Sequence, residues 1–257
     1  MDTHSEIKEL SKFLSDYSTS LMGVGAQTSR IVKNSARIAE SQGYSVEMMI
    51  FQKTIITTIR DEENTHSYSS VSVIKPLALN FEINSSLSTL SWEAYDNHLS
   101  LEELKEQFNL IIAKPRMSRW TVLFLVACAN ASFCRLFTGD WQAMAVVFVA
   151  TLVGFFVRQE MMHRHANHFF VFVVSSFIAS IIGSSAVNFH LGNTPDIALA
   201  TSVLYLIPGV PLINSITDLL DGHVLAGFSR FINAALLIIC IAIGLSITLL
   251  LLGGETL

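Results

Sequence analysis

The sequence lacks several of the patterns that identify soluble enzymes and secreted proteins. Only 14% of its 257 residues are charged, and it contains 5 prolines and 3 cysteines. The cysteines, Cys128, Cys134 and Cys240, all lie in apolar runs, so we expect small packing residues rather than a disulfide framework. The first twenty positions hold scattered charges and no continuous apolar stretch, which predicts no secretory signal.

Motifs for nucleotide, metal and nucleic-acid chemistry are also missing from the first 113 residues. They contain no phosphate-binding loop, no nucleophile elbow and no zinc-type cysteine pair. They carry 9 Lys/Arg against 15 Asp/Glu, a net charge of −6, which argues against nucleic acid as a partner. We therefore expect no cofactor, no metal and no catalytic residue. The single histidines His66 and His98 are expected at the surface or in packing.

Apolar residues are abundant, at 51% of the chain, and the mean hydropathy is +0.49. They are concentrated in the back half, where residues 114–257 carry 7 Lys/Arg and 6 Asp/Glu, a net charge of +1. A polar front half is thus joined to an apolar back half. The prediction is a cytoplasmic α+β domain over residues 1–113, followed by a transmembrane helical domain over residues 114–257.

The front domain alternates between two hydrophobic periods. Helical spacing predicts helices over residues 5–22, 26–42 and 83–94. Runs of β-branched and apolar residues predict three strands, at Val46–Phe51, Thr54–Ile59 and Tyr68–Ile74. Ser100-Leu101-Glu102-Glu103 is a capping box that predicts the start of a last helix.

Five apolar runs in the back half predict about five membrane spans. Four are unbroken and 17 to 22 residues long: Trp120–Phe137, Trp141–Val157, Phe169–Phe189 and Phe231–Leu252. The fifth, Ile197–Leu220, has 24 residues and contains two prolines. The first two runs lie close together, so a re-entrant hairpin is the alternative for them.

The fifth run should be interrupted halfway. Pro208 and Pro211 have no N–H to donate, and Gly209 between them adds backbone freedom. Unpaired backbone at this depth is tolerated only against protein or a water-filled cavity, and a broken helix of this kind is typical of transporters. A simple packing kink is the alternative.

Polar residues follow the break at helical spacing. Asn214, Asp218 and Asp221 share one face of the half-helix that Pro211 would start. An acid inside a membrane segment usually has a task, and Asp218 would act either as a proton carrier or as the orienting partner of a cation such as Arg230. Otherwise Asp218 is solvated at the cytoplasmic interface. The N-terminus of this half-helix would suit a carboxylate. The candidate substrate-binding residues are Pro208, Gly209, Pro211, Asn214, Asp218 and Arg230.

The distribution of Lys and Arg residues predicts how the chain is oriented across the membrane. With the front domain in the cytoplasm, six of seven would lie inside: Lys114, Arg116 and Arg119 before the first span, Arg158 and Arg164 in the second inside loop, and Arg230 in the third. Arg135 is left near the outer side, where it either snorkels to headgroups or attracts anions. The prediction is a multi-pass protein of the cell inner (cytoplasmic) membrane with a cytoplasmic N-terminus. His163, His165 and His168 are expected to meet lipid headgroups rather than a metal.

Small and hydroxylated residues recur in the predicted spans, among them Ser175, Ser176 and Gly183. Such residues let helices approach closely in lipid. The alternative is that some of the hydroxyls line a polar path.

The stretch Leu206–Asp218, continued by Gly222-His223, Gly227 and Arg230, resembles the threonine/serine exporter family. The chain is similar to the larger subunit of the split, two-component form, which is associated with succinate export. Weaker resemblance is carried by residues of the front domain and of the first predicted outer loop: Gly25-Ala26, Arg30, Arg37 and Gly43, and Phe133, Gly139-Asp140 and Trp141. Thr138 departs from the pattern, since relatives often have a further glycine there.

The resemblance implies a membrane subunit of a secondary exporter for small carboxylates or amino acids, of the threonine/serine or succinate class. Family members have more spans than the five predicted here, which implies that a smaller membrane subunit of the same family supplies the rest. Homo- and hetero-oligomers both stay open. The alternatives are a membrane-anchored sensor or scaffold whose cytoplasmic domain recruits a partner, and a membrane-anchored enzyme.

Overall fold

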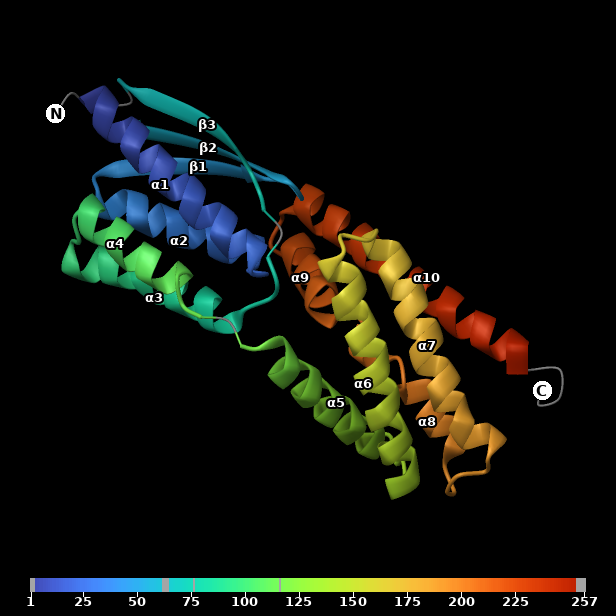
Figure 1. Cartoon of the computed structure of the whole chain (residues 1–257). Coiled ribbons are helices and arrows are strands. Elements are labelled where there is room, and N and C mark those ends of the chain that lie inside the picture. The colour runs from blue at the N-terminus through green and yellow to red at the C-terminus, as the bar shows by residue number, and fades with distance from the viewer. Residues whose placement is uncertain (1–2, 62–64, 76, 116, 253–257) are drawn as a thin grey trace. The chain divides into compact units, whose positions relative to one another are not determined.

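The structure, a computed structural model, describes residues 3–61, 65–75, 77–115 and 117–252. It divides into two compact units (Figure 1). The first comprises Met1–Pro115 together with Gly209–Ile232, and the second Arg116–Pro208 together with Asn233–Leu257. Each unit has its own core.

The first unit is an α+β structure in its N-terminal part, as predicted. Its four N-terminal helices are α1 (Thr3–Gly23), α2 (Thr28–Ser41), α3 (Phe81–Asn97) and α4 (Leu101–Ile112). Strands β1 (Tyr44–Ile50), β2 (Thr54–Asp61) and β3 (Ser67–Val73) pair antiparallel in the order β1-β2-β3. The capping box at Ser100 is present and opens α4. Helix α9 (Gly209–Leu220) and the start of α10 (Val224–Leu252) complete this unit.

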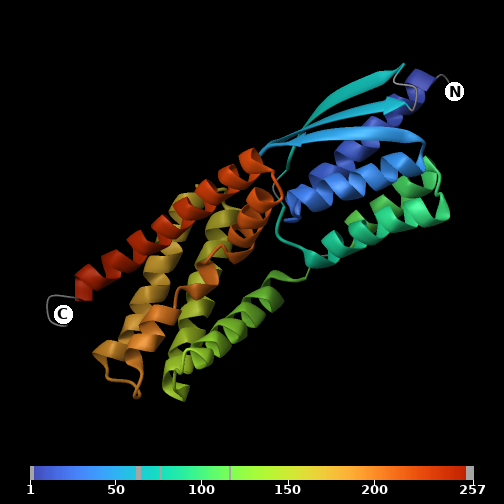
Figure 2. The same ribbon diagram turned by 180° about the vertical axis from the view of Figure 1, so that it is seen from behind.

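The N-terminal elements form three layers. Helices α1 and α2 cover one face of the sheet, and α3 and α4 form the layer beyond them (Figures 1 and 2). On β2 the buried residues Ile55, Thr57 and Ile59 alternate with partly buried ones, so one face of the strand is directed at the core. The period-2 pattern of the sequence therefore marks the covered face of the sheet.

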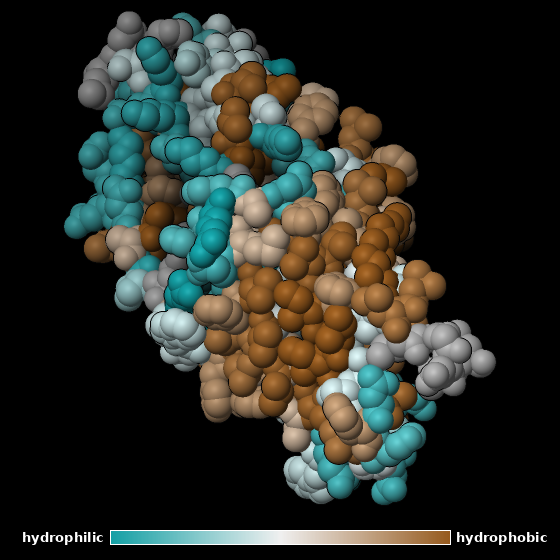
Figure 3. Space-filling view, turned by 45° about the vertical axis from the view of Figure 1, so that its right-hand side comes forward, coloured by the Kyte–Doolittle hydropathy of each residue, from teal (hydrophilic) through white to brown (hydrophobic). Residues whose placement is uncertain are grey.

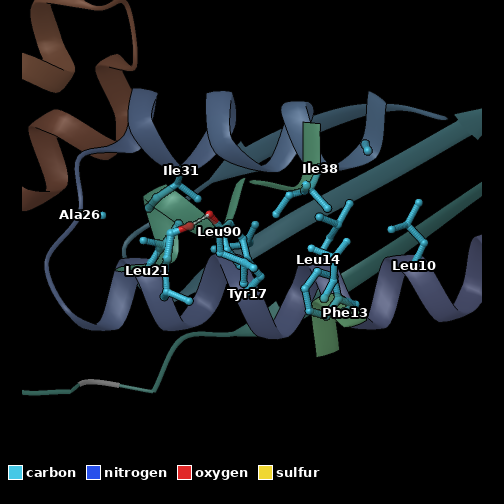
Figure 4. Close-up of a cluster of buried hydrophobic side chains, with 14 of the residues drawn as sticks. Leu10, Phe13, Leu14, Tyr17, Leu21, Ala26, Ile31, Ile38 and Leu90 are labelled. Carbon is cyan, nitrogen blue, oxygen red and sulfur yellow. Dashed lines mark hydrogen bonds between the residues drawn. The ribbon is translucent and has the colours of Figure 1, made fainter. Parts of the chain in front are cut away.

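The core of this unit is built around the first two helices and includes residues of the sheet and of α3 and α4. Leu14, Tyr17 and Leu21 of α1 point toward Ile31 and Ile38 of α2, and all five are fully buried (Figure 4). The Tyr17 hydroxyl donates a 2.7 Å hydrogen bond to the Leu87 carbonyl oxygen. Burial is the main cause that raises the pKa of Tyr17, so the phenol is neutral and its polar tip is satisfied.

His66 and His98 both lie at the surface, as expected. His66 is exposed and its Nδ1 lies 3.1 Å from Oδ2 of Asp61. Hydrogen bonds, first from the Thr65 hydroxyl, lower the pKa of Asp61 to about 2. His98 is exposed and ends α3 in the left-handed conformation.

The second unit is entirely helical over its described residues. It contains α5 (Arg119–Leu136), α6 (Trp141–His163), α7 (His168–Asn188), α8 (Pro195–Thr201), the short 3-10 helix η1 (Leu204–Leu206) and the remainder of α10. Helix α6 packs against α5 and α7, and α7 packs against α8. The three cysteines form no disulfide, and Cys134 is buried among small residues.

Among the described residues, three helices are long and apolar enough to cross a membrane, namely α6, α7 and α10. The broken pair Pro195–Leu206 and Gly209–Leu220 raises the number to four if it counts as one span. Helix α5 is not among them, because Arg119, Asn130 and Arg135 lower its hydropathy, so the predicted count of about five spans is not confirmed. A broad hydrophobic area nevertheless covers the surface over the apolar helices (Figure 3).

Two boundary predictions were wrong. Helix α6 does not end at Val157 but continues to His163, and α10 begins at Val224 rather than at Phe231, so Arg158 and Arg230 lie inside helices rather than in loops. The last two turns of α6 are polar yet helical, since Glu160 accepts a 3.0 Å bond from Arg164 four residues on and lies 3.7 Å from Arg119 of α5.

Small residues allow α7 and α10 to pack closely within this unit. A Cβ on Gly244 would collide with the Ser176 hydroxyl and with the backbone of Val173 and Phe177. The Ser180 and Thr248 hydroxyls lie 2.6 Å apart across the same contact. These features support the packing interpretation of the small residues.

We expect Gly244→Ala to destabilise the protein by about 1–3 kcal/mol, because overpacking against backbone atoms outweighs the roughly 1 kcal/mol gained in helix propensity. The midpoint of thermal unfolding (Tm) in detergent measures this. Gly209→Ala is the matched control, since a Cβ there meets no described atom within 4 Å. Equal Tm values for the two variants would contradict the packing role.

Candidate functional site

The predicted break is present and is wider than a single kink. Helix α8 ends at Thr201, η1 covers Leu204–Leu206, and Ile207 and Pro208 are not helical. Helix α9 begins at Gly209, two residues earlier than predicted. Pro211 therefore lies in the first turn of α9, where its missing N–H costs no helical hydrogen bond. Pro208, and not Pro211, marks the interruption.

The backbone exposed by the break finds a partner within the second unit. Asn130 of α5 is almost fully buried, and its Nδ2 donates to the Thr201 carbonyl oxygen at 3.2 Å and to the Thr151 hydroxyl at 2.7 Å. The end of α8 is thus satisfied by protein, as backbone at membrane depth requires. Sequence reasoning missed Asn130. The available signal was a lone asparagine in an otherwise apolar run.

A cavity lies beside the break in the same unit. Its volume is about 420 Å³, which falls in the range of small-molecule sites. Apolar and aromatic side chains line most of it, together with Tyr205 and with Asn130, whose Oδ1 has no hydrogen-bond partner within the described ranges. The lining residues are Val126, Ala129, Asn130, Phe133, Phe137, Leu204, Tyr205 and Ile207.

Asp218 is the centre of a second arrangement, inside the first unit. Its side chain is fully buried, and Oδ2 lies 3.2 Å from Nη1 of Arg230 on α10. Its two carboxylate oxygens also accept hydrogen bonds from Thr28, one from the backbone N–H and one from the hydroxyl, both at 2.9 Å. Asp218 is therefore paired and hydrogen-bonded within the protein. Its burial rules out the alternative in which Asp218 is exposed to solvent at the cytoplasmic interface.

The contact with Thr28 makes Asp218 the cap of a distant helix. Thr28 is the first residue of α2, and the preceding Gln27 makes no side-chain cap bond. A carboxylate at this position satisfies an N–H group that helix α2 leaves unpaired and lies at its positive dipole end. Asp218 thus joins α9 to α2 across 190 residues of sequence.

Asn214 and Arg230 hold the loop that leads into α2. Asn214 Nδ2 donates to the Gly25 carbonyl oxygen at 2.9 Å, and Arg230 Nη1 donates to that of Ala26 at 3.2 Å. Gly25 has a φ of +92°, a conformation that favours glycine. The two stretches that resemble the exporter family, a weaker one at Gly25-Ala26 and a stronger one around Asp218, therefore contact each other in the structure.

Glycines position α9 and α10 for this contact. Gly222 ends α9 with a φ of +85°, and the His223 N–H bonds to the Asp218 carbonyl oxygen at 2.8 Å, which forms a Schellman turn. A Cβ on Gly227 would meet the Ser215 carbonyl oxygen at 2.8 Å. The two helices can approach closely, which brings Arg230 to Asp218.

Of the six candidate residues, Asn214, Asp218 and Arg230 come together. Gly209 and Pro211 lie in the first turn of the same helix α9, and Pro208 belongs to the second unit. Asp221 is exposed and takes no part. Within the described ranges, no cluster of three or more His, Cys, Asp or Glu residues could hold a metal ion.

The loop between α5 and α6 also explains part of the resemblance. The Asp140 carboxylate accepts the N–H groups of Ala143 at 2.8 Å and Asn193 at 2.5 Å, and these bonds lower its pKa. Thr138 has a φ of +67°, so a β-branched residue occupies a backbone conformation where glycine is preferred. Arg135 donates to the Gly139 carbonyl oxygen at 3.0 Å.

Comparison with known proteins supplies the family. A family model described as "Putative threonine/serine exporter" matches residues 12–252. The chain is 30% identical over 237 residues to the "Probable succinate transporter subunit YjjP" of Klebsiella aerogenes, covering 91% of this chain and 90% of the relative. The protein of the same description from Escherichia coli (strain K12) is also 30% identical over 237 residues, with 91% of each chain covered. No solved structure matches.

We expect Asp218→Ala to destabilise the full chain by about 3–5 kcal/mol, because it leaves the buried Arg230 guanidinium unpaired. Unfolding in detergent measures this, with exposed Asp221→Ala as the matched control. The double variant Asp218→Ala/Arg230→Ala should lose clearly less than the sum of the single losses. Additive losses would contradict the ion pair.

We expect Thr138→Gly to stabilise the protein by about 1 kcal/mol, because relief of the left-handed strain exceeds the entropy that glycine adds to the unfolded chain. A rise in Tm would support this. A fall in Tm would show that Thr138 makes compensating contacts.

Proposed function

The chain belongs to the threonine/serine exporter family, and from that membership we propose that it is one subunit of a secondary exporter for small carboxylates or amino acids, acting with a smaller membrane partner. The observation that carries the proposal is the broken segment Ser202–Pro208 with a cavity of about 420 Å³ beside it. Broken helices in transporters hold substrate near the middle of the bilayer. The transported class is threonine and serine, or succinate.

The partner is inferred from two observations. The relatives are described as a transporter subunit, a term that implies another chain. The described residues contain only three or four candidate spans. A smaller membrane subunit of the same family would supply the rest of the pathway. Since the relatives are described as transport proteins, the proposal is an exporter rather than an enzyme.

The proposed setting is the cell inner membrane, with the N-terminal α+β domain, residues 1–113, in the cytoplasm and residues 114–257 as the membrane domain. The positive-inside rule supports this orientation through Lys114, Arg119, Arg164 and Arg230. Arg116, which entered the same argument, lies outside the described residues.

We assign separate roles to the candidate residues. Pro208, Gly209 and Pro211 shape the break that contacts the solute. Asn214, Asp218 and Arg230 hold the loop Gly25–Thr28, which ties the proposed cytoplasmic domain to α9. Of the two tasks considered for Asp218, the 3.2 Å ion pair favours the orienting partner of Arg230. Proton coupling is the further proposal, because protonation would remove the charge that holds Arg230 and would weaken the contact with Thr28.

Reconstitution tests the proposed function. Vesicles containing this chain and the smaller subunit, loaded with labelled threonine, serine or succinate, are expected to release at least one of them faster when a proton gradient is applied. Vesicles that contain this chain alone are the control that shows whether efflux requires the smaller subunit. No efflux of any of the three solutes from vesicles with both subunits would refute the exporter.

We expect Asp218→Asn to uncouple export from the proton gradient. The amide keeps an acceptor for the Thr28 N–H but loses the charge, so gradient-driven efflux should fall at least tenfold while downhill exchange persists. Asp221→Asn is the control for an exposed acid three residues away. Unchanged gradient dependence in Asp218→Asn would remove the coupling role and leave the orienting one.

The sensor or scaffold alternative has one specific observation in its favour. On the face of the sheet opposite α1 and α2, Met49, Val71 and Val73 are exposed by 59%, 69% and 72%. Such residues suit a protein contact. This alternative predicts that the chain binds a protein and passes no solute in the vesicle assay, an outcome that the exporter excludes.

A further inference from the structure

Arg158 of α6 is a cation that has no acidic partner in the part of the chain that the structure describes. It lies five residues before the end of the helix, and its guanidinium carbon lies 5.5 Å from the ring centre of Phe155 and 4.9 Å from that of Phe172 on α7. Among the residues that the structure describes, it has no hydrogen-bond or ion-pair partner. The side chain is partly buried between aromatic rings of two helices. A charge in such a place is costly unless it has a task.

The other described arginines of this unit are all satisfied. Arg119 and Arg164 share the Glu160 carboxylate, at 3.7 and 3.0 Å. Arg135 donates to a backbone carbonyl. Arg158 lies only two residues before Glu160 on the same helix, yet Glu160 is paired with the other two. The guanidinium of Arg158 therefore remains available to a ligand.

Two polar groups accompany Arg158. The Tyr205 hydroxyl, from η1 in the broken segment, donates a long, 3.4 Å bond to the Ser175 carbonyl oxygen of α7, and the Tyr205 ring packs against Phe155, one of the two rings beside Arg158. The Ser175 hydroxyl is fully buried and has no hydrogen-bond partner among the described residues. A cation and two hydroxyls thus come from α6, η1 and α7. The ring of His168, at the start of α7, lies 5.0 Å from that of Phe172, the second ring beside Arg158.

The fold makes room for this arrangement. Gly154 lies one turn before Arg158 on the same face of α6, and a Cβ there would collide with the Tyr205 hydroxyl. The Tyr205 ring packs edge-on against Phe155, with ring centres 5.9 Å apart. Tyr205 also lines the cavity of about 420 Å³ beside the break. One side chain therefore links Arg158 to the cavity.

We propose that Arg158 binds the carboxylate of the transported solute, with the hydroxyls of Tyr205 and Ser175 as additional hydrogen-bond partners. The inference rests on the proposed export function and names a contact that the function requires. A guanidinium matches a carboxylate with two parallel hydrogen bonds, and the rings of Phe155 and Phe172 hold its plane in a weakly polar surrounding. The same chemistry would also bind the phosphate of a lipid headgroup, which the test separates.

Binding is measured first, without transport. Purified full-length protein in detergent, with its small partner, is heated with threonine, serine or succinate, and in a second arm with a short-chain phosphatidylglycerol. We expect the transported carboxylate to raise the Tm of the wild type and of Arg164→Gln, the matched arginine control. We expect no rise for Arg158→Gln. An Arg158-dependent rise with the phospholipid alone would assign the site to a lipid and overturn the proposal.

Transport is measured second, in vesicles. Arg158→Gln should raise KM for the carboxylate by roughly 10- to 100-fold, the loss expected for a charged hydrogen-bonded pair. Arg158→Lys should give an intermediate KM, because the charge is kept but the fork is lost. Tyr205→Phe keeps the ring against Phe155 and removes only the hydroxyl, so it should raise KM by a smaller factor. It therefore tests the proposed site even if Arg158→Gln folds poorly.

The outcomes separate the two proposals. A wild type that transports, together with an unchanged KM in Arg158→Gln and Tyr205→Phe, overturns the carboxylate site and leaves the exporter standing. A wild type that transports none of the solutes overturns both. An equal rise of KM in Arg158→Gln and Arg164→Gln would indicate a general loss of positive charge and would also overturn the site.

Discussion

The buried carboxylate of Asp218 is the interaction on which the first unit depends. It joins the neighbouring helices α9 and α10 to the distant helix α2, because it accepts two hydrogen bonds from the start of α2 and pairs with Arg230 of α10. A buried ion pair of this kind adds little net stability relative to an apolar pair, but it is strongly destabilising when one partner is lost. Its value is therefore to specify where α9 sits on the N-terminal domain. The glycines at positions 25, 222 and 227 all serve that placement.

In the second unit, polar groups are few and most have backbone partners. Asn130 satisfies the end of α8, and the hydroxyls of Ser176, Ser180 and Ser184 bond to carbonyl groups three residues earlier. This accounts for most of the hydroxylated residues as packing elements. Against that background, the groups of this unit without a hydrogen-bond partner among the described residues stand apart, namely the Asn130 Oδ1, Gln159 Oε1 and Ser175 Oγ atoms and the guanidinium of Arg158. Asn130 bonds to the end of α8, and Ser175 bonds through its carbonyl oxygen to Tyr205 of the interrupted segment.

Local chemistry made much of the fold predictable. The capping box at Ser100, the alternation along β2 and the proline at 208 each act over a few residues, so they indicated an element or a break correctly. The pairing of Asp218 with Thr28 could not be predicted, because nothing in either segment encodes a partner 190 residues away. The end of α6 was missed for another reason. Hydropathy falls after Val157, but the helix is held by backbone hydrogen bonds and continues through polar residues. That error hid Arg158 in a presumed loop. The roles of the six candidate residues and the division at residue 113 remain predictions.

The nature of the bonds to Thr28 has an evolutionary consequence. One of them comes from the main chain, which every residue type except proline provides. A homologue can therefore carry another residue at position 28 and keep the hydrogen bond from the backbone N–H. At position 218 the two acceptor oxygens and the charge that pairs with Arg230 all belong to the side chain, so a neutral residue would lose the ion pair. Drift at this contact should be one-sided, with position 28 varying in sequence while the acid at position 218 is retained.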